Sequence, residues 1–269
     1  MTAAATFPNL CRHWRQRRHL SQLDLAESAA ISQRHLSWLE TGKSQPSREM
    51  VLRLAEALEV PLRERNSLLH AAGFAAQYRE SSLDEPNMAP IRDALAQVLR
   101  HHEPFPAVVV DRRWNRVMGN SASDLMLSLA GAPTSGGTES SEEPFNLAAA
   151  TLAPEGLRRF ITNGEVALPL FVQRLRSEAL SSGDPATISH VEALIRAAGD
   201  LPEVTPSPEP LLPVMPLDLD IDGLKLSLFT IMSTFGTPQD ITTDELRIEA
   251  FYPADEETRT FFTTAVQGA

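Results

Sequence analysis

Hydrophobic residues between positions 9 and 73 recur every three or four residues, which is the period of an amphipathic helix. Leu10 and Trp14 form the apolar stripe of the first segment, and Val51, Leu54 and Leu58 form that of the fourth. Residues that favour helix starts stand before the later segments, at Ser21, Ser32, Ser47 and Pro61. The pattern therefore predicts five short helices joined by brief turns, and so a compact all-α domain.

The pattern changes beyond residue 74. Residues 74–90 are predicted to form a linker that leads into a helix from about Pro90 to His101. A β-like run follows from Phe105 to Val110, with a turn and a return strand from Trp114 to Gly119. Further helices are expected at 121–129, 154–162, 165–181 and 186–198, and further strands at 224–234 and 246–252. This second region is predicted to be mixed α+β.

Two biased stretches interrupt the second region. Residues 131–144 are rich in Gly, Ser, Thr and Glu, and residues 202–213 are rich in Pro, so both are expected to be flexible. A length of 269 residues suits two domains. We therefore expect an all-α domain at 1–75, a linker and connecting helix at 76–103, and an α+β domain at 104–269.

Composition indicates the cellular compartment of the protein. The sequence has no run of about 18 apolar residues, and Met1 to Pro8 lacks the pattern of a secretory signal. Cys11 is the only cysteine, which excludes an internal disulfide, and no metal-ligand spacing surrounds it. These observations predict a cytoplasmic protein that does not enter a membrane.

Charge is distributed unevenly along the chain. The net charge of −11 argues at first against a nucleic-acid partner. Residues 1–80, however, hold eleven Lys and Arg against eight Asp and Glu, whereas the remainder holds 13 against 27. Arg12, Arg15, Arg17 and Arg18 all precede the first acidic residue, Asp24. A basic N-terminal module on an acidic body fits contacts with phosphates.

The strongest functional pattern lies in residues 20–26 and 31–43. In the third predicted helix, Leu36 and Leu39 turn inward, whereas Gln33, Arg34 and Ser37 share the outer face. Such a helix fits a major groove, where Gln pairs with adenine and Arg pairs with guanine. The candidate DNA contacts are Gln22, Ser32, Gln33, Arg34, Ser37, Trp38, Lys43 and Arg48.

Two other interpretations of the helical domain stay open. Solvated side chains on an ordinary helical bundle give a similar polar face, and Arg17 and Arg18 fit that interpretation equally well. Trp38 fits either a contact with DNA, at the sugar-phosphate backbone or a thymine methyl group, or a place in the core. The competing function is a protein-interaction adaptor or antitoxin-like module, in which the helical domain binds a protein instead of DNA.

Residues 10–60 resemble the XRE family of helix-turn-helix regulators, which have the lambda-repressor-like fold. One departure is Ala30, where the family often has Gly, because Ala is strained at positive φ. The family often pairs an Arg of the first helix with the Glu that ends the third. The resemblance therefore implies a structural ion pair between Arg15 and Glu40, and double-stranded DNA as a partner.

The chain beyond residue 61 is similar to the MmyB-like regulators. The segments that carry this similarity are 61–75, 78–80, 104–111 with Trp114-Asn115 and Asn120, 235–240, 245–249 and 251–255. In that family the C-terminal domain is PAS-like and is thought to bind a small, lipid-like ligand. The resemblance implies a one-component regulator controlled by a fatty-acid-like ligand. Paired half-sites on DNA favour a homodimer.

A PAS-like domain leaves an apolar pocket between its helices and one face of its sheet. The candidate lining residues are Val108, Val110, Met118, Phe160, Phe171, Leu228 and Ile231. An acidic head group needs a cation, for which Arg174, Arg176 and Arg247 are candidates. Ordinary core packing is the competing interpretation for the apolar residues, and solvation or ion pairing is that for the arginines.

The sequence carries no complete pattern of catalytic or metal-binding residues. His101 and His102 are adjacent on one predicted helix, so their rings point apart and do not make a metal site. Asp218, Asp220 and Asp222 alternate as in a calcium loop but lack the rest of that pattern, and a solvated acidic turn is expected. The sequence therefore predicts no enzyme, no metal site and no cofactor.

Overall fold

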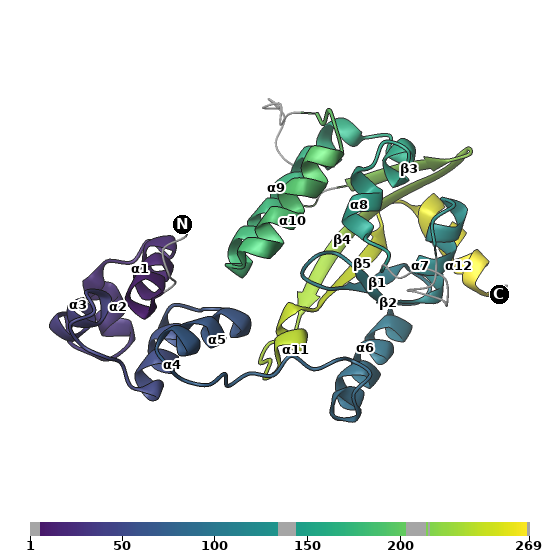
Figure 1. Cartoon of the computed structure of the whole chain (residues 1–269). Coiled ribbons are helices and arrows are strands. Elements are labelled where there is room, and N and C mark those ends of the chain that lie inside the picture. The colour runs from purple at the N-terminus through teal and green to yellow at the C-terminus, as the bar shows by residue number, and fades with distance from the viewer. Residues whose placement is uncertain (1–5, 134–143, 203–213, 215, 268–269) are drawn as a thin grey trace. The chain divides into compact units, whose positions relative to one another are not determined.

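The computed structural model describes residues 6–133, 144–202, 214 and 216–267. The chain divides into two compact units (Figure 1). Unit 1 comprises Met1–Ser81 and Pro238–Asp244, and unit 2 comprises Ser82–Thr237 and Glu245–Ala269. The expected flexible stretches at 131–144 and 202–213 lie mostly outside the described residues.

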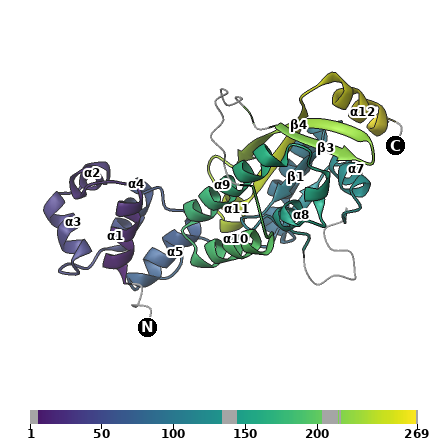
Figure 2. The same cartoon turned by 90° about the horizontal axis from the view of Figure 1, so that it is seen from above.

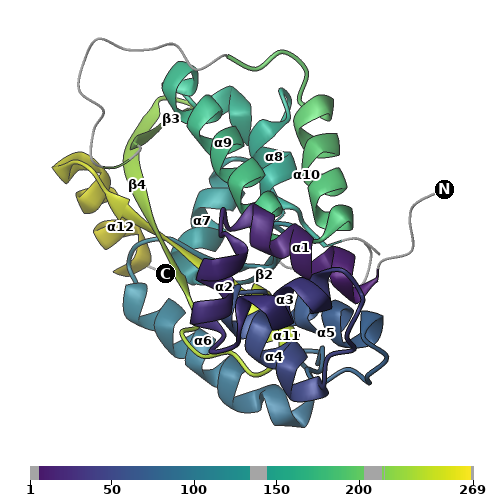
Figure 3. The ribbon, with the colours of Figure 1, turned by 90° about the vertical axis from the view of Figure 1, so that its left-hand side faces the viewer.

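Unit 1 contains the predicted series of short helices (Figure 3). They are α1 (Phe7–Arg17), α2 (Gln22–Ser28), α3 (Gln33–Glu40), α4 (Arg48–Ala57) and α5 (Leu62–Ala71). Ser21, Ser32 and Ser47 each cap a helix, because their side chains accept hydrogen bonds from backbone N–H groups three residues later. The local signals read from the sequence therefore start these helices where they were expected.

The core of unit 1 fixes the orientation of α3. Trp14 of α1, Leu25 of α2 and Leu54 of α4 are buried with Leu36 and Leu39, which are both 0% exposed. The turn between α2 and α3 holds Ala30 at φ +51°, the left-handed conformation that normally favours glycine. Burial of one side of α3 leaves its opposite side free for solvent or a partner.

Unit 2 is built on an antiparallel sheet, five-stranded among the described residues. Its strands are β1 (Ala107–Val110), β2 (Arg116–Gly119), β3 (Pro216–Ile221), β4 (Leu224–Thr234) and β5 (Arg247–Pro253). The strand order is β2-β1-β5-β4-β3. Within β1, alternate side chains enter different cores: Val108 and Val110 join one, and Ala107 and Val109 join the other.

Helices cover the two faces of this sheet unequally. Helix α6 (Ala89–His102), which follows the 3-10 turn η1 (Pro86–Met88), packs Leu95 and Leu99 against Val109 on one face. The larger core on the other face involves α7 (Ser121–Leu129), α8 (Leu147–Leu152), the 3-10 turn η2 (Leu157–Phe160), α9 (Gly164–Ser182), α10 (Pro185–Ala197) and α12 (Glu256–Gln267). Helices α9 and α10 lie side by side (Figure 2).

Some local expectations for unit 2 are wrong. The helix expected at 154–162 is replaced by the short turn η2, and α8 and α12 were not anticipated. Asp218 and Asp220 lie in β3, opposite Ser227 and Lys225, because they alternate with the partly buried Leu217 and Leu219, a pattern that favours a strand. A turn is present only beyond them, at Asp222, where φ is +52°.

Candidate nucleic-acid interface and ligand pocket

The outer face of α3 is the candidate reading surface. Gln33 and Arg34 are exposed, Ser37 is half-buried, and Trp38 is 40% exposed. The Arg34 guanidinium lies 4.6 Å from the centre of the Trp38 ring, one helical turn away. This stacking leaves the N–H groups at the edge of the guanidinium available to another acceptor.

A buried carboxylate locks the end of α3. Glu40, whose side chain is 0% exposed, accepts hydrogen bonds from Arg15 Nε at 2.7 Å and from Arg15 Nη2 at 2.9 Å. Gln22 Nε2 donates to the same carboxylate at 2.8 Å, and Arg12 donates to the Glu40 carbonyl at 2.7 Å. Burial alone raises the pKa of Glu40, but these hydrogen bonds and charges outweigh it and lower the pKa below its ordinary value.

Several other candidate contacts already have structural roles within unit 1. Ser32 caps α3, and the side-chain amide of Gln22 is engaged by Glu40. Arg48 donates to the Ala75 carbonyl at 2.9 Å and to Gln77 Oε1 at 3.0 Å, so it ties the segment after α5 to α4. Lys43 is exposed beyond the end of α3. The structure therefore brings Gln33, Arg34, Ser37 and Trp38 together and gives Gln22 and Arg48 internal partners.

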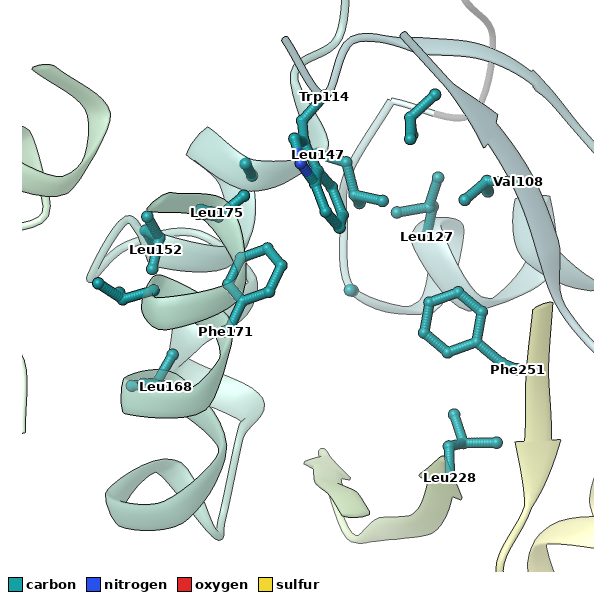
Figure 4. Close-up of a cluster of buried hydrophobic side chains, with 14 of the residues drawn as sticks. Val108, Trp114, Leu127, Leu147, Leu152, Leu168, Phe171, Leu175, Leu228 and Phe251 are labelled. Atoms are coloured by element: carbon teal, nitrogen blue, oxygen red, sulfur yellow. The ribbon is translucent and has the colours of Figure 1, made fainter. Parts of the chain in front are cut away.

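A cavity of about 100 Å³ lies in unit 2 between its larger helical layer and the sheet. Phe171 of α9 and Trp114 point toward one another, with ring centres 5.0 Å apart, and Phe251 of β5 faces this region (Figure 4). The rest of the lining is largely aliphatic and comes from α7, α8, η2, α9 and β3. An interior wall of this kind suits an apolar ligand.

The polar side chains of the cavity wall include Arg174, Glu249, Thr151 and Thr230. Arg174 Nη1 donates to Glu249 Oε1 at 2.8 Å, and Arg174 Nη2 donates to Glu249 Oε2 at 2.5 Å. Its Nε donates to Glu178 Oε1 at 2.8 Å. Burial would lower the pKa of Arg174, but the hydrogen bonds and charges of the two glutamates raise it above its ordinary value. Glu249, only 3% exposed, is therefore neutralised by its partner.

The sequence-based set of pocket residues is only partly gathered at this cavity. Phe160, Phe171 and Arg174 line it. Val108, Val110 and Leu228 are buried in the same core but do not line the cavity.

Met118 and Ile231 were wrongly expected to line the pocket. Met118 pairs with Val109, whose side chain packs under α6, so Met118 lies on the opposite face of the sheet. Ile231 is 47% exposed. The next residue, Met232, is the cross-strand partner of Glu249, which lines the cavity. Adjacent strand residues point to opposite faces, so Ile231 points away from the cavity.

Sequence reasoning missed other functional candidates. Glu249 and Phe251 share one face of β5 because they are two residues apart, a signal that alternation in the strand contained. Of the other candidate cations, Arg176 pairs with Glu192 at an exposed site, and Arg247 lies 3.9 Å from Glu178.

Metal-binding groups and membrane-spanning helices are both absent from the part of the chain that the structure describes. There, no group of three or more His, Cys, Asp or Glu side chains is placed to hold a metal ion. None of the described helices has both the length and the apolar character needed to cross a bilayer.

Comparison with known families agrees with this two-part architecture. The model described as the MmyB-like transcription regulator ligand binding domain matches residues 91–264. The chain belongs to the MmyB-like transcription regulators. In this MmyB-like regulator, a second model, described as a helix-turn-helix domain, matches residues 10–68. Both predicted family resemblances are thereby confirmed, as are the predicted all-α and α+β fold classes.

The MmyB-like regulator was also compared with solved structures and curated proteins. A similar solved structure is the PAS domain from Bordetella pertussis BvgS, with 15% sequence identity and a TM-score of 0.27. The alignment covers 65% of this chain and 97% of that chain. The comparison with curated proteins finds no match.

Proposed function

We propose that this MmyB-like regulator binds specific sequences of double-stranded DNA through α3, as a homodimer in the cytoplasm, under the control of a ligand held in unit 2. The observation that carries the DNA-binding proposal is the pair of opposite faces on α3. Leu36 and Leu39 are fully buried, whereas Gln33 and Arg34 are exposed on the other face. A recognition helix needs this division between packing and reading.

The exposed side chains have the chemistry of direct readout. A Gln side chain pairs with the donor and acceptor of adenine, and an Arg side chain pairs with the two acceptors of guanine. Stacking of Arg34 on Trp38 restricts the guanidinium before any contact is made, which reduces the entropy lost on binding. The excess of basic residues over acidic ones in residues 1–80 supports phosphate contacts around this face.

The cavity supports an apolar ligand with an acidic group, of the fatty-acid class. Its wall is mostly apolar and includes the half-buried cation of Arg174. A carboxylate on the ligand competes with Glu249 for the two Nη groups of Arg174. At about 100 Å³ the cavity is smaller than the roughly 150 Å³ cavity that holds benzene. Entry of an acyl chain therefore moves the lining, as a ligand that shifts a conformational equilibrium requires.

The DNA-binding proposal is tested by fluorescence anisotropy with duplexes from the region upstream of the protein's own gene. Arg34→Ala is expected to weaken specific binding by about 1–3 kcal/mol and to relax selectivity at one base pair. Arg53→Ala is the matched control, because Arg53 is exposed on α4 and pairs with Glu49 within its own helix. Equal binding and selectivity in wild type and Arg34→Ala would exclude this role for α3. Salt-insensitive capture of a protein, without any DNA shift at low salt, would favour the adaptor function.

A further inference from the structure

The connection between β4 and β5 belongs to a different unit from the two strands that it joins. Strand β4 ends at Thr234 and β5 begins at Arg247, both in unit 2. Residues 238–244 between them belong to unit 1 and include most of α11 (Ile241–Glu245). The polypeptide therefore passes between the two units at three points: after Ser81, after Thr237 and after Asp244. We call residues 238–244 the coupling segment.

Hydrogen bonds join the coupling segment to residues 79–81, where the first part of unit 1 ends. The Ile241 N–H donates to the Arg79 carbonyl at 2.8 Å, and the Thr242 hydroxyl donates to the Ser81 carbonyl at 2.7 Å. The Ser81 N–H donates in turn to Asp240 Oδ1 at 3.3 Å. Ile241 and Ser81 are both buried, at 4% exposed. These contacts define a docked position for the segment.

Asp244 makes a further contact with a helix of the helix-turn-helix domain. The N–H of Leu62, the first residue of α5, donates to Asp244 Oδ2 at 2.9 Å across 182 positions of the sequence. The residue before α5 is Pro61, whose side chain carries no hydrogen-bond acceptor. The first N–H groups of a helix need such acceptors, and a carboxylate there also interacts favourably with the helix dipole. Asp244 therefore acts as a cap for α5 that comes from a distant part of the chain.

The strands on both sides of the coupling segment line the ligand cavity. Thr230 of β4 and Glu249 and Phe251 of β5 are in the cavity wall. Thr234 and Arg247 are cross-strand partners, so the chain leaves and re-enters the sheet at adjacent positions. Only three peptide steps join Asp244 to Arg247, and they span at most about 11 Å. The connection is too short to be flexible, so a shift of β5 is expected to move Asp244 as well.

We propose that the coupling segment transmits the state of the cavity to the helix-turn-helix domain, with Asp244 as the positioning residue. This proposal rests on the proposed function, which assigns a ligand to the cavity of unit 2 and DNA to α3 of unit 1. A ligand that displaces the Arg174–Glu249 pair moves β5, and this movement changes how Asp244 caps α5. Helix α5 packs against α1 and α4 in unit 1, and α1 supplies the arginine that holds the end of α3. Ligand occupancy therefore alters the placement of the reading helix.

The test measures amide hydrogen exchange in the full-length protein, which requires no DNA. The cavity is perturbed in two independent ways: by adding decanoic acid, and by the filling substitution Ala167→Leu in the lining of α9. At least one perturbation is expected to change exchange of the Leu62, Ser81 and Ile241 amides by about fivefold, the low end of ordinary allosteric coupling. Asp244→Ala should abolish the response in α5 while keeping the response in β4 and β5. Asp244→Asn, which keeps an acceptor oxygen, should restore it in part.

The matched control is Ser47→Ala. It removes the side-chain cap of α4 in the same unit but leaves the coupling segment intact, so its α5 amides should still respond. Unchanged exchange at Leu62 under both perturbations, or equal responses in wild type and Asp244→Ala, would overturn the coupling. A full response at Leu62 in a protein that binds no duplex would support the coupling and reject the DNA-binding proposal.

Discussion

Each unit contains a buried glutamate that accepts two hydrogen bonds from the guanidinium group of one arginine, but the surroundings of the two pairs differ. In unit 1, Glu40 accepts from Arg15 and Gln22 and is enclosed on every side. In unit 2, Glu249 and Arg174 form part of the wall of a cavity. The same chemistry therefore holds the end of a helix in one unit and lines a cavity in the other, where we propose that a ligand competes for the arginine. Under this proposal, access from a cavity, rather than the strength of the ion pair, distinguishes the pair in unit 2 from the structural pair in unit 1.

The largest expected effect is the loss of the enclosed pair in unit 1. Glu40→Ala leaves the largely buried Arg15 without its carboxylate, and the loss of one partner of a buried pair costs about 3–5 kcal/mol. Urea unfolding should show this loss together with disappearance of specific DNA binding. Glu49→Ala on the exposed pair with Arg53 should change stability by less than about 1 kcal/mol. Comparable stability of the two variants would show that Glu40 does not lock α3.

The same residue gives unit 1 a defined dependence on pH. The pKa of Glu40 is lower in the folded state than its ordinary value of 4.5. Its contribution to stability is therefore present above that value and is lost as the pH falls through the lower, folded pKa. Urea unfolding between pH 6 and pH 3, compared with Glu40→Gln, should show a steeper loss in wild type. Parallel curves would contradict this assignment.

The next effect concerns the pair in the cavity wall. Arg174→Met removes the cation but keeps an unbranched side chain, so the preference for decanoic acid over decanol should fall by about 1.5–3 kcal/mol. Isothermal titration calorimetry measures both ligands. Arg176→Met serves as the control because Arg176 lies on the same helix in an exposed pair with Glu192. An undiminished acid preference in Arg174→Met would place the head group elsewhere.

A smaller effect is expected on the reading face. Trp38→Ala removes the ring on which Arg34 stacks, and an exposed cation–π contact contributes about 0.5–1 kcal/mol. DNA affinity should fall by that amount, while the urea midpoint should stay within the range of surface substitutions. Leu23→Ala, at another exposed apolar position, is the control. A large loss of stability in Trp38→Ala would instead assign Trp38 to the core.

The smallest effect lies in the turn between α2 and α3. Ala30 adopts φ +51°, a conformation that costs an L-residue about 1–2 kcal/mol, whereas glycine adopts it freely. Because glycine also gains entropy in the unfolded chain, Ala30→Gly should stabilise unit 1 by only about 0.5 kcal/mol. Thermal unfolding should show a small upward shift. A downward shift would indicate that the Ala30 methyl group makes contacts that outweigh the strain.

The helical domain was predictable because its signals are local. Ser21, Ser32 and Ser47 cap helices a few residues away, and Leu36 and Leu39 mark the buried side of α3 through helical period alone. The pocket depended on neighbours that are distant in sequence. The face of Ile231 was decided by the register between β4 and β5, and a shift of one residue reverses such an assignment.

By itself, the sequence determined the two kinds of domain and the outer face of α3, because caps and hydrophobic period act within a few residues. Only the tertiary structure decided which residues line the cavity, that Arg174 pairs with Glu249, and that Asp244 caps a helix that begins 182 positions away. These contacts arise from strand register and close packing between segments far apart in the chain, and no local pattern encodes them.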